Sequence, residues 1–411
     1  MRVLFTTLPG AGMFHPHVPL ARTLQEAGHE VAFAVAQSYC STIETTGFRC
    51  FVAGYDWHSN ALDRLTATVK SLRGDVGFAG LRDIFGTFLA SKMVPDLLAL
   101  AHSWRPDMIL RDPMEFGGCV TAEALNIPHA ASGPLFAFWD GAWHGAPGEV
   151  DRPELDELRL AYGLPPDPEL RMLHRYLNLA FMPASFPNPA LRPPPTVHYF
   201  SMTGFNQSGA EALPSWFASL PDRPTVHASL GTVFNRTPGV LAAIIEGLRN
   251  KEINLIVTVG PDQDPAVFGP QPPNVHIERY IPHALLLPRC DVMVTHCGFS
   301  TIMTCLEHGL PMVTVPLAGG DQPGNAARCA TLGAARLVTP MERTPEIIGE
   351  AVMDVLREPR YRQNAMRLRR EMQALPGPGQ AVGLLERLVL EKAPIIDTGR
   401  AQEFRTNGWP V

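Results

Sequence analysis

The sequence predicts an α/β protein made of two open sheets of parallel strands, each covered by helices. Three observations support this fold class. Short runs of β-branched residues alternate with longer stretches of helical periodicity, which is the pattern of strands joined by crossover helices. The chain has 411 residues, too many for a single compact core. A segment with five prolines, ASFPNPALRPPP at residues 184–195, separates two such alternating series.

The first series is expected to form an N-terminal domain, residues 1–213. Its expected strands are Val3–Leu8, Val31–Val35, Met108–Leu110 and Pro128–Ala131, and its expected helices are Val18–Glu26 and Cys119–Leu125. The region Trp57–His102 is predicted to be mainly helical and interrupts the alternation. Such an insertion is expected to build one wall of a binding site.

The second series is expected to form a C-terminal domain, residues 214–375. Its expected strands are Thr225–Ser229, Asn254–Val259, Val275–Arg279, Val292–His296, Met312–Val315 and Arg336–Val338. Its expected helices are Pro238–Arg249, Ser300–His308, Gly324–Leu332, Pro345–Arg357 and Tyr361–Ala374. Residues 376–411 are predicted to form a helix, Ala381–Lys392, that crosses back to the N-terminal domain, and a loosely held tail. Two open sheets of this kind bind ligands in the crevice at the carboxyl ends of their strands.

The composition excludes several classes of function. The 34 basic and 40 acidic residues give a formal net charge of −6, so no basic field is available to hold a nucleic acid or an anionic membrane. No stretch of about 18 residues free of charge and proline offers a membrane span, and the N-terminus does not resemble a signal peptide. We therefore expect a cytoplasmic protein.

The seven cysteines are expected to be reduced and mostly buried. Their number is odd and they contain no C-x-x-C pair, so the sequence indicates neither a disulfide framework nor a zinc cluster. The sequence DQD at residues 262–264 matches a D-x-D metal motif, but glycine and proline residues flank it, and a solvated turn is the favoured interpretation. No metal site is predicted.

The first glycine-rich turn argues against a dinucleotide site. Gly10-Ala11-Gly12-Met13-Phe14-His15 begins like G-x-G-x-x-G, but His15 stands where the third glycine would allow close helix–strand packing. The second expected strand ends at Val35-Ala36-Gln37, without an acid to hold a ribose diol. We therefore expect a strand-to-helix turn without NAD.

The strongest chemical signal is the segment His296-Cys297-Gly298-Phe299-Ser300-Thr301. Because a strand is expected to end at His296, Gly298 to Thr301 begin the next helix, where free N–H groups and the helix dipole favour a diphosphate. His296 adds an imidazole donor, and Ser300 and Thr301 add hydroxyl groups. An alternative stays open in which His296 caps a turn and Ser300 is an N-cap.

Together with other segments, these residues resemble the donor-binding signature of family 1 glycosyltransferases. The match comprises His-x-Gly-x-x-Thr at residues 296–301, Gly309-x-Pro311 and Asp321-Gln322. Further matching segments recur along nearly the whole chain, at Pro16–Ala21, Gly28–Val31, Arg111–Glu115, Ser229–Thr232 and Tyr280–His283. The sequence is most similar to bacterial enzymes that decorate natural products. The resemblance implies two Rossmann-like domains facing across a cleft, the glycosyltransferase B fold.

The resemblance also implies a donor site in the C-terminal domain, with the acceptor in the N-terminal one. The donor site would comprise Ser229, Gly231, Thr232, Tyr280, Ile281, His283, His296, Gly298, Phe299, Ser300, Thr301, Asp321 and Gln322. His296, Ser300 and Thr301 would hold the diphosphate, with Gly231 and Thr232 in the facing turn. Tyr280 would lie against the base, and the Ile281 backbone would read its edge. Asp321 and Gln322 would bind sugar hydroxyls.

Three departures from the family pattern affect the mechanism. Met13 stands where the family has the histidine that deprotonates the acceptor, and a thioether cannot accept a proton. Thr304 replaces the glutamate that binds ribose hydroxyls, which favours thymidine diphosphate (TDP) over uridine diphosphate (UDP). The stretch of residues 316–321 is one residue longer than usual, so the position of Asp321 stays open.

Met13 leaves the acceptor proton to a neighbouring group, to water, or to no group if the acceptor is already acidic. His15 and Asp112 are the candidate catalytic residues, because His15 is close to Met13 and Asp112 matches the acid partner of the family's histidine. His17 is a further neighbour. The alternative for His15 is a turn histidine packed before Pro16, and the alternative for Asp112 is a strand-end cap.

The sequence therefore predicts an inverting hexosyltransferase of antibiotic biosynthesis, without metal or other cofactor. It would move a sugar or deoxysugar from a nucleoside diphosphate, with TDP favoured, to a small lipophilic natural product in one direct displacement. The acceptor is expected to contact Met13, Phe138 and Trp139, although these two aromatic residues fit a core equally well. A catalytically idle donor-binding homologue and a nucleotide-sugar epimerase stay open as alternatives, and so does a homodimer.

Overall fold

The computed structural model describes residues 1–56, 84–133, 153–168, 170–189, 193–201, 212–231, 237–260, 263–317 and 321–397. The chain divides into two compact units. Unit 1 comprises Met1–Met202 and Leu375–Val411, and unit 2 comprises Thr203–Ala374. The chain thus leaves unit 1 shortly after the proline-rich segment and returns to it at Leu375.

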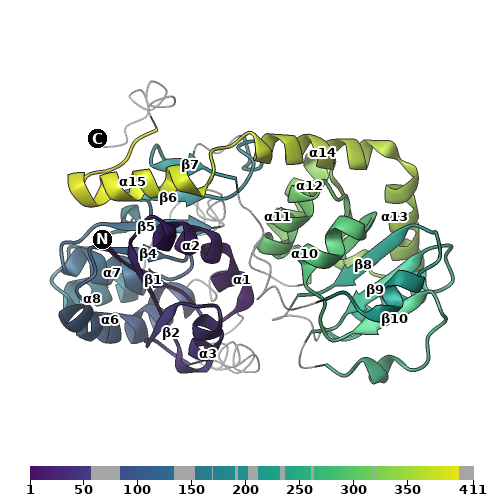
Figure 1. The fold of residues 1–411 in the computed structure, drawn as a ribbon, viewed down its shortest axis with the longest axis horizontal. Coiled ribbons are helices and arrows are strands. Elements are labelled where there is room, and N and C mark those ends of the chain that lie inside the picture. Colours follow the sequence, from purple (N-terminus) through teal and green to yellow (C-terminus); the bar gives the residue numbers. More distant parts are fainter. Residues whose placement is uncertain are drawn as a thin grey trace. The chain divides into compact units, whose positions relative to one another are not determined.

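Unit 1 is built on a parallel sheet of seven strands in the order β3-β2-β1-β4-β5-β6-β7 (Figure 1). Its strands are β1 (Arg2–Thr6), β2 (Glu30–Val35), β3 (Arg49–Val52), β4 (Met108–Arg111), β5 (His129–Gly133), β6 (Leu177–Ala180) and β7 (Val197–Tyr199). Strands β1 and β2 are mainly apolar and are buried apart from their first residues, as strands covered on both faces must be.

The helices of unit 1 connect these strands and cover the sheet. They are α1 (Ala11–Phe14), η1 (His15–His17), α2 (Val18–Glu26), α3 (Gln37–Thr45), η2 (Ile84–Leu89), α6 (Ala90–Trp104), α7 (Gly117–Ala124), α8 (Pro153–Ala161), η4 (Arg171–His174) and α15 (Pro378–Glu391). Helix α15 comes from the far end of the chain and packs along α2 (Figure 1). Glu386 of α15 contacts His29 at 3.1 Å.

Unit 2 is built on a parallel sheet of six strands in the order β10-β9-β8-β11-β12-β13. The strands are β8 (Thr225–Ser229), β9 (Asn254–Thr258), β10 (Val275–Glu278), β11 (Val292–Thr295), β12 (Met312–Thr314) and β13 (Ala335–Leu337). The helices are η5 (Ser215–Ser219), α9 (Val240–Leu248), η6 (Pro265–Phe268), α10 (His283–Leu286), η7 (Leu287–Arg289), α11 (Phe299–Glu307), α12 (Gln322–Thr331), η8 (Pro340–Glu342), α13 (Pro345–Arg357) and α14 (Pro359–Gln373). The core of unit 2 lies between the sheet and the apolar faces of α9 and α13.

Both sheets reverse their strand order at one point, and this point sets the place of a ligand site. The order reverses between β1 and β4 in unit 1 and between β8 and β11 in unit 2. Because the connections leave neighbouring strands in opposite directions there, sheets of this kind bind ligands outside the carboxyl ends of these strands. The turns after β8 and β11 contain Ser229–Gly231 and His296–Gly298, which the sequence had assigned to the donor site.

The predicted fold class is confirmed: both sheets are parallel and both units are Rossmann-like. Residues 57–83 of the predicted helical insertion lie outside the described residues, and η2 and α6 form its remainder. The sequence did not predict α3, β3, α8 or the short strands β6 and β7. β6 and β7 have only four and three residues, too few to show a strand period.

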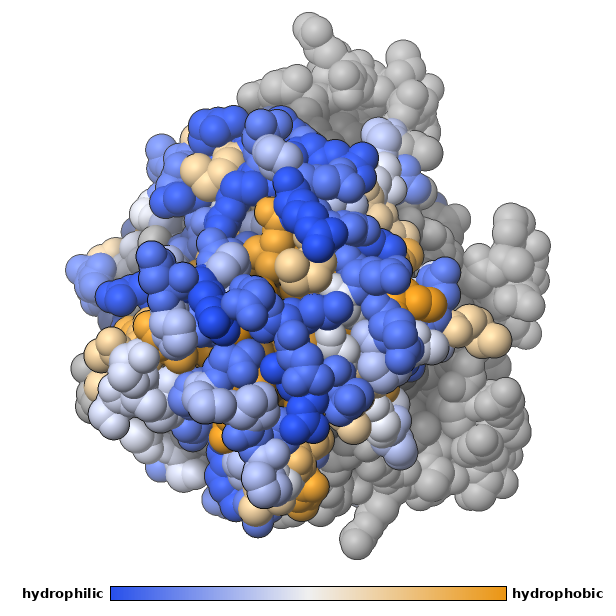
Figure 2. All heavy atoms as spheres, turned by 90° about the vertical axis from the view of Figure 1, so that its right-hand side faces the viewer, coloured by the Kyte–Doolittle hydropathy of each residue, from blue (hydrophilic) through white to orange (hydrophobic). Residues whose placement is uncertain are grey.

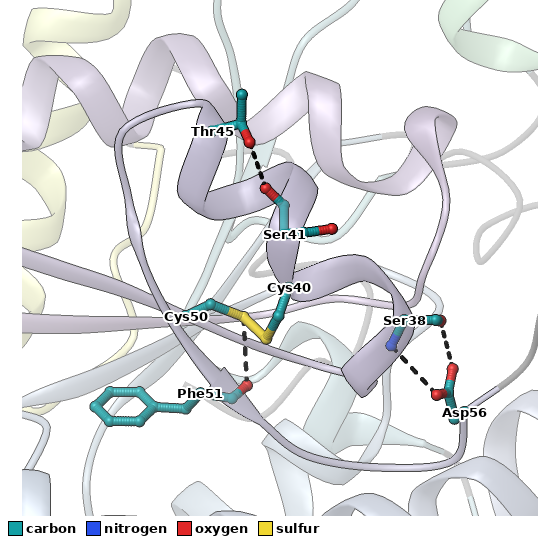
Figure 3. Close-up of a disulfide and its surroundings, with 7 residues drawn as sticks. All are labelled: Ser38, Cys40, Ser41, Thr45, Cys50, Phe51 and Asp56. Carbon is teal, nitrogen blue, oxygen red and sulfur yellow. Dashed lines mark hydrogen bonds between the residues drawn. A yellow bond between two sulfur atoms is a disulfide. The ribbon is translucent and has the colours of Figure 1, made fainter.

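One expectation about the cysteines is wrong. Cys40 of α3 and Cys50 of β3 form a disulfide, with their Cα atoms 5.6 Å apart (Figure 3). Beside it, the Asp56 carboxylate accepts hydrogen bonds from the hydroxyl and the backbone N–H of Ser38 (Figure 3). The sequence did not reveal the pair, because the two cysteines meet only when α3 packs on β3. The other cysteines are free and buried, namely Cys119, Cys290, Cys297, Cys305 and Cys329.

The surface offers no membrane-spanning element in the part of the chain that the structure describes. None of the helices there is both long and apolar enough to cross a bilayer. The face drawn in Figure 2 is mainly hydrophilic, with hydrophobic residues scattered between hydrophilic ones. Scattered hydrophobic residues of this kind are ordinary on a protein surface.

Candidate active site

Two turns of unit 2 lie side by side because the strands before them are paired. Thr295 of β11 is in register with Ser229 of β8, so the turns after both strands leave the sheet at the same edge. Gly231 has a φ of +75°, a backbone conformation that favours glycine. Its N–H donates a hydrogen bond to the Ser229 hydroxyl at 3.3 Å. The structure therefore brings the turn after β8 close to His296, as expected from the sequence.

The imidazole of His296 lies between these two turns. A Cβ atom on Gly231 would lie 2.6 Å from its Cε1, and one on Gly298 would lie 2.7 Å from its Nε2. Real Cβ atoms do not approach so closely, so any side chain at either glycine would displace the ring. The two glycines thus fix the imidazole and keep their own backbone close to it.

Two further histidines lie in the same part of unit 2. His283 begins α10, and its ring meets that of His227 edge-on, with the ring centroids 5.2 Å apart. Burial lowers the pKa of His283 to about 4, and burial together with the charge of His283 lowers the pKa of His296 to about 4. The same two causes hold the pKa of His227 well below its ordinary value. All three imidazoles are therefore neutral at pH 7 and present N–H donors.

Helix α11 begins at Phe299, and its N-cap residue, Gly298, has no side chain that could cap it. The backbone N–H groups of its first turn lie at the positive end of the helix dipole. Phe299 is buried, and Ser300 and Thr301 are half-buried in this turn. Thr304, one turn further on, donates its hydroxyl to the Ser300 carbonyl at 2.9 Å.

Asp321 and Gln322 lie at the start of α12, and both are held within unit 2. The Asp321 carboxylate accepts a hydrogen bond from Asn325 Nδ2 at 2.8 Å. Burial raises the pKa of Asp321, and the hydrogen bonds from Asn325 and from the Phe299 backbone oppose the rise. Gln322 is buried, and its Oε1 accepts the Leu317 N–H at 2.8 Å. The fold thus brings Asp321 to the beginning of α11.

Tyr280 and Ile281 follow β10 and differ in exposure. Tyr280 is 45% exposed, whereas Ile281 is 2% exposed. An exposed aromatic face can stack on a base, and a buried Ile281 can offer only its backbone. Both features suit the roles that the resemblance implied.

In unit 1 the imidazole partner of Asp112 is His17. The two side chains are buried, with His17 Nε2 3.7 Å from Asp112 Oδ2. The other ring nitrogen, Nδ1, lies 2.7 Å from the Ser132 hydroxyl. His15 and Met13 are half-buried nearby in η1 and α1. His17 is four residues after Met13 in a continuous helical run, so the two residues share a face of that run.

Several predicted site residues lie outside the described residues, namely Thr232, Phe138 and Trp139. Residue 262 of the D-x-D segment also lies outside them. Asp264 of that segment caps η6 by accepting the Ala266 N–H at 3.2 Å, which is the role of a turn residue. In the described parts of the chain, no group of three His, Cys, Asp or Glu side chains is placed to hold a metal ion.

Sequence reasoning missed His227 and Asn325. His227 is fully buried in β8 and lies on the same face of this strand as Thr225 and Ser229, and such a polar face on a buried strand is a usable signal. Asn325 follows Asp321 by four residues in a predicted helix, which is the spacing of side chains that contact each other.

Solved structures with the same fold are glycosyltransferases. The glycosyltransferase VinC in complex with dTDP is 26% identical, covers 95% of this chain and 100% of its own, and gives a TM-score of 0.75. Spinosyn forosaminyltransferase SpnP is 25% identical with the same coverage and a TM-score of 0.74. The fold and the enzyme class that the sequence predicted are therefore confirmed: the protein is a glycosyltransferase of the B type.

Comparison with protein families gives the particular family. Residues 22–231 match the N-terminal domain, and residues 243–388 the C-terminal domain, of erythromycin biosynthesis protein CIII-like proteins. The 4'-demethylrebeccamycin synthase of Lentzea aerocolonigenes is 32% identical over 94% of this chain and 99% of its own. The chain belongs to the erythromycin biosynthesis protein CIII-like family. These relatives do not favour an epimerase or a catalytically idle homologue.

Proposed function

We propose that the protein transfers a sugar or deoxysugar from a TDP donor to a small lipophilic natural product. The transfer inverts the anomeric carbon and needs neither a metal ion nor another cofactor. The position of His296 between Gly231 and Gly298, at the beginning of α11, supports the proposal most directly. Helix N–H groups, the helix dipole and an imidazole donor converge there, and this combination favours a diphosphate.

The acceptor class is inferred from the names of the relatives. The family is named for erythromycin biosynthesis, and the relative from Lentzea for a rebeccamycin derivative. We therefore expect an antibiotic or a related natural product as the acceptor.

The nucleotide preference depends on Thr304. Its hydroxyl donates a hydrogen bond to the Ser300 carbonyl. Its side chain is shorter than the glutamate side chain that would accept a hydrogen bond from a ribose 2′-hydroxyl. A TDP donor has no 2′-hydroxyl, so it loses no hydrogen bond when threonine replaces glutamate at position 304. The dTDP complex of VinC supports the same preference.

Departure of the diphosphate is assisted by groups of unit 2. Negative charge develops on the leaving oxygen, and the first turn of α11 and His296 can stabilise it without a metal ion. The pKa of His296 is about 4 before an anion binds, mainly because of burial, and an adjacent diphosphate would raise it. His15 and Asp112 of unit 1 are the groups that we propose for the acceptor proton.

The proposal is tested by measuring the binding of TDP and UDP to the purified protein by calorimetry, in direct competition. We expect TDP to bind more tightly, and His296→Ala to weaken TDP binding by about 1.5–3 kcal/mol, the range for a hydrogen bond to a charged group. His276→Ala is the matched control. His276 is a histidine of β10 in the same unit, and its ring stacks on that of Trp216, with the ring centroids 3.8 Å apart. Tighter UDP binding contradicts the nucleotide preference, and unchanged affinity in His296→Ala contradicts the site.

A further inference from the structure

Cys297 joins His296 to Gly298, and its backbone is held in an unusual conformation. Its φ is +74°, in the left-handed region that side chains other than glycine rarely adopt. Such a conformation persists only when its surroundings fix it. The Cys297 N–H donates to the Thr295 hydroxyl at 3.1 Å, and the Cys297 carbonyl accepts from Asn325 Nδ2 at 2.8 Å.

Asn325 makes two contacts with one amide group. Its Nδ2 donates to the Cys297 carbonyl and to Asp321 Oδ2, each at 2.8 Å. Both partners are acceptors, so the orientation of the amide is fixed by chemistry. Asn325 is fully buried on α12 and therefore does not contact a substrate itself.

The contact with Cys297 also sets the direction of the next N–H group. The Cys297 carbonyl and the Gly298 N–H belong to one planar trans peptide, so they point in opposite directions. When Asn325 holds the carbonyl, the Gly298 N–H points to the other side of the chain. Gly298 directly precedes α11 and lies against His296.

We propose that Asn325 is a positioning residue of the donor site. It orients the peptide between Cys297 and Gly298 for the diphosphate, and it couples this peptide to Asp321, the proposed sugar ligand. The inference rests on the proposed function, because it assigns the diphosphate to this turn. A merely structural amide would stabilise unit 2 without changing how tightly the phosphates bind.

The test compares the affinities of TDP and thymidine, with calorimetry for TDP and ligand-observed NMR for thymidine. We expect Asn325→Ala to weaken TDP binding by about ten-fold or more and to change thymidine binding by less than about two-fold. Asn325→Asp keeps the shape but removes the Nδ2 donor, so it should show the same selective loss if Asn325→Ala folds poorly.

Asn254→Ala is the matched control. Asn254 is also buried in unit 2, and its Nδ2 also donates to backbone carbonyls, those of Pro221 at 2.9 Å and Arg223 at 3.2 Å. It begins β9, at the opposite end of the strands from the site. This variant should lower the melting temperature and leave both affinities within about two-fold of wild type.

The outcomes separate the inference from the proposed function. An unchanged ratio of TDP to thymidine affinity in folded Asn325 variants overturns the inference. If the wild-type protein prefers UDP, the nucleotide preference is wrong, and the same ratio measured with UDP and uridine decides the role of Asn325. A wild-type protein that binds neither diphosphate overturns both.

Discussion

Asp112 directs both of its carboxylate oxygens at groups of unit 1. Its Oδ1 accepts the Met114 N–H at 2.8 Å, and its Oδ2 faces His17 Nε2. Both side chains of this pair are buried, His17 at 0% and Asp112 at 1% exposure. His15 is half-buried and is nearer in the chain than His17 to the glycine-rich turn after β1. His15 and Asp112 stay the groups that we propose for the acceptor proton, and His17 is the imidazole that lies against Asp112.

At this residue scale, we expect His15→Ala and Asp112→Asn each to lower turnover by about 10²-fold or more, the usual effect of losing a general base. Both variants should keep wild-type TDP affinity and should spare acceptors of low pKa. Steady-state kinetics with a weakly acidic alcohol and with a phenol measure the difference. His17→Gln is the comparison variant. If it loses as much turnover as Asp112→Asn while His15→Ala keeps full turnover, the acceptor proton is removed by the buried pair of His17 and Asp112 and not by His15. Full turnover in both His15→Ala and Asp112→Asn would exclude both groups.

At the scale of elements, the disulfide joins α3 to β3, which is an outer strand of the sheet (Figure 3). The chain between the two cysteines spans ten positions, and closing so short a loop contributes about 2–3 kcal/mol. Burial raises the pKa of Cys119 and Cys329 to about 12, and it also raises the pKa values of Cys290, Cys297 and Cys305. These thiols are therefore inert while the protein is folded.

We expect a thiol reagent to detect five thiols in denaturant without reductant and seven after reduction. Cys50→Ser should give six under the first condition, because it frees Cys40. The double variant Cys40→Ser, Cys50→Ser should lower the free energy of unfolding of unit 1 by about 2–3 kcal/mol. Seven thiols in the unreduced protein would show that the bond is absent.

At the scale of the whole molecule, we expect stability in acid to depend on the charged groups around the buried Glu123 in unit 1. Glu123 of α7 is paired with Arg159 of α8 at 2.9 Å and with Arg175 at 2.8 Å, and His129 lies 3.9 Å away. Burial would raise the pKa of Glu123, but His129, Arg175 and Arg159 together lower it to about 2. Because the folded pKa lies below the unfolded value, the carboxylate stabilises the protein above about pH 4.5. This contribution is lost as the pH falls from there toward 2.

We expect Glu123→Gln to lower the free energy of unfolding at pH 7 by about 3 kcal/mol, since one pKa unit corresponds to about 1.4 kcal/mol. In a unit of this size, that loss corresponds to about 6–12 °C in melting temperature. Scanning calorimetry between pH 7 and pH 3 should show a shrinking difference between the variant and wild type. Glu26→Gln is the exposed control on α2 and should leave the profile unchanged. A constant difference across this pH range would contradict the assignment.

Much of the fold could be predicted from the sequence because its signals are local. The strand at β8 and the helix at α13 were predicted with their exact bounds, since apolar periodicity and a proline at the helix start mark them. Much of the proposed donor site could be located from the sequence for the same reason: His296, Gly298 and Ser300 are close neighbours in the chain. The short strands β6 and β7 and the cysteine pair could not be predicted, because no local pattern records a long-range contact.

The sequence by itself determined two parallel sheets, the glycine-containing turn between β11 and α11, and a methionine, Met13, where the family pattern has a histidine. These features depend on residue type, spacing and strand period, which are readable along the chain. Only the tertiary structure decided that Asp112 pairs with His17, that Cys40 bonds to Cys50, and that Asn325 holds the Cys297 carbonyl. The physical reason is that each of these contacts joins groups on different elements, and their distance depends on how the sheet and its helices pack.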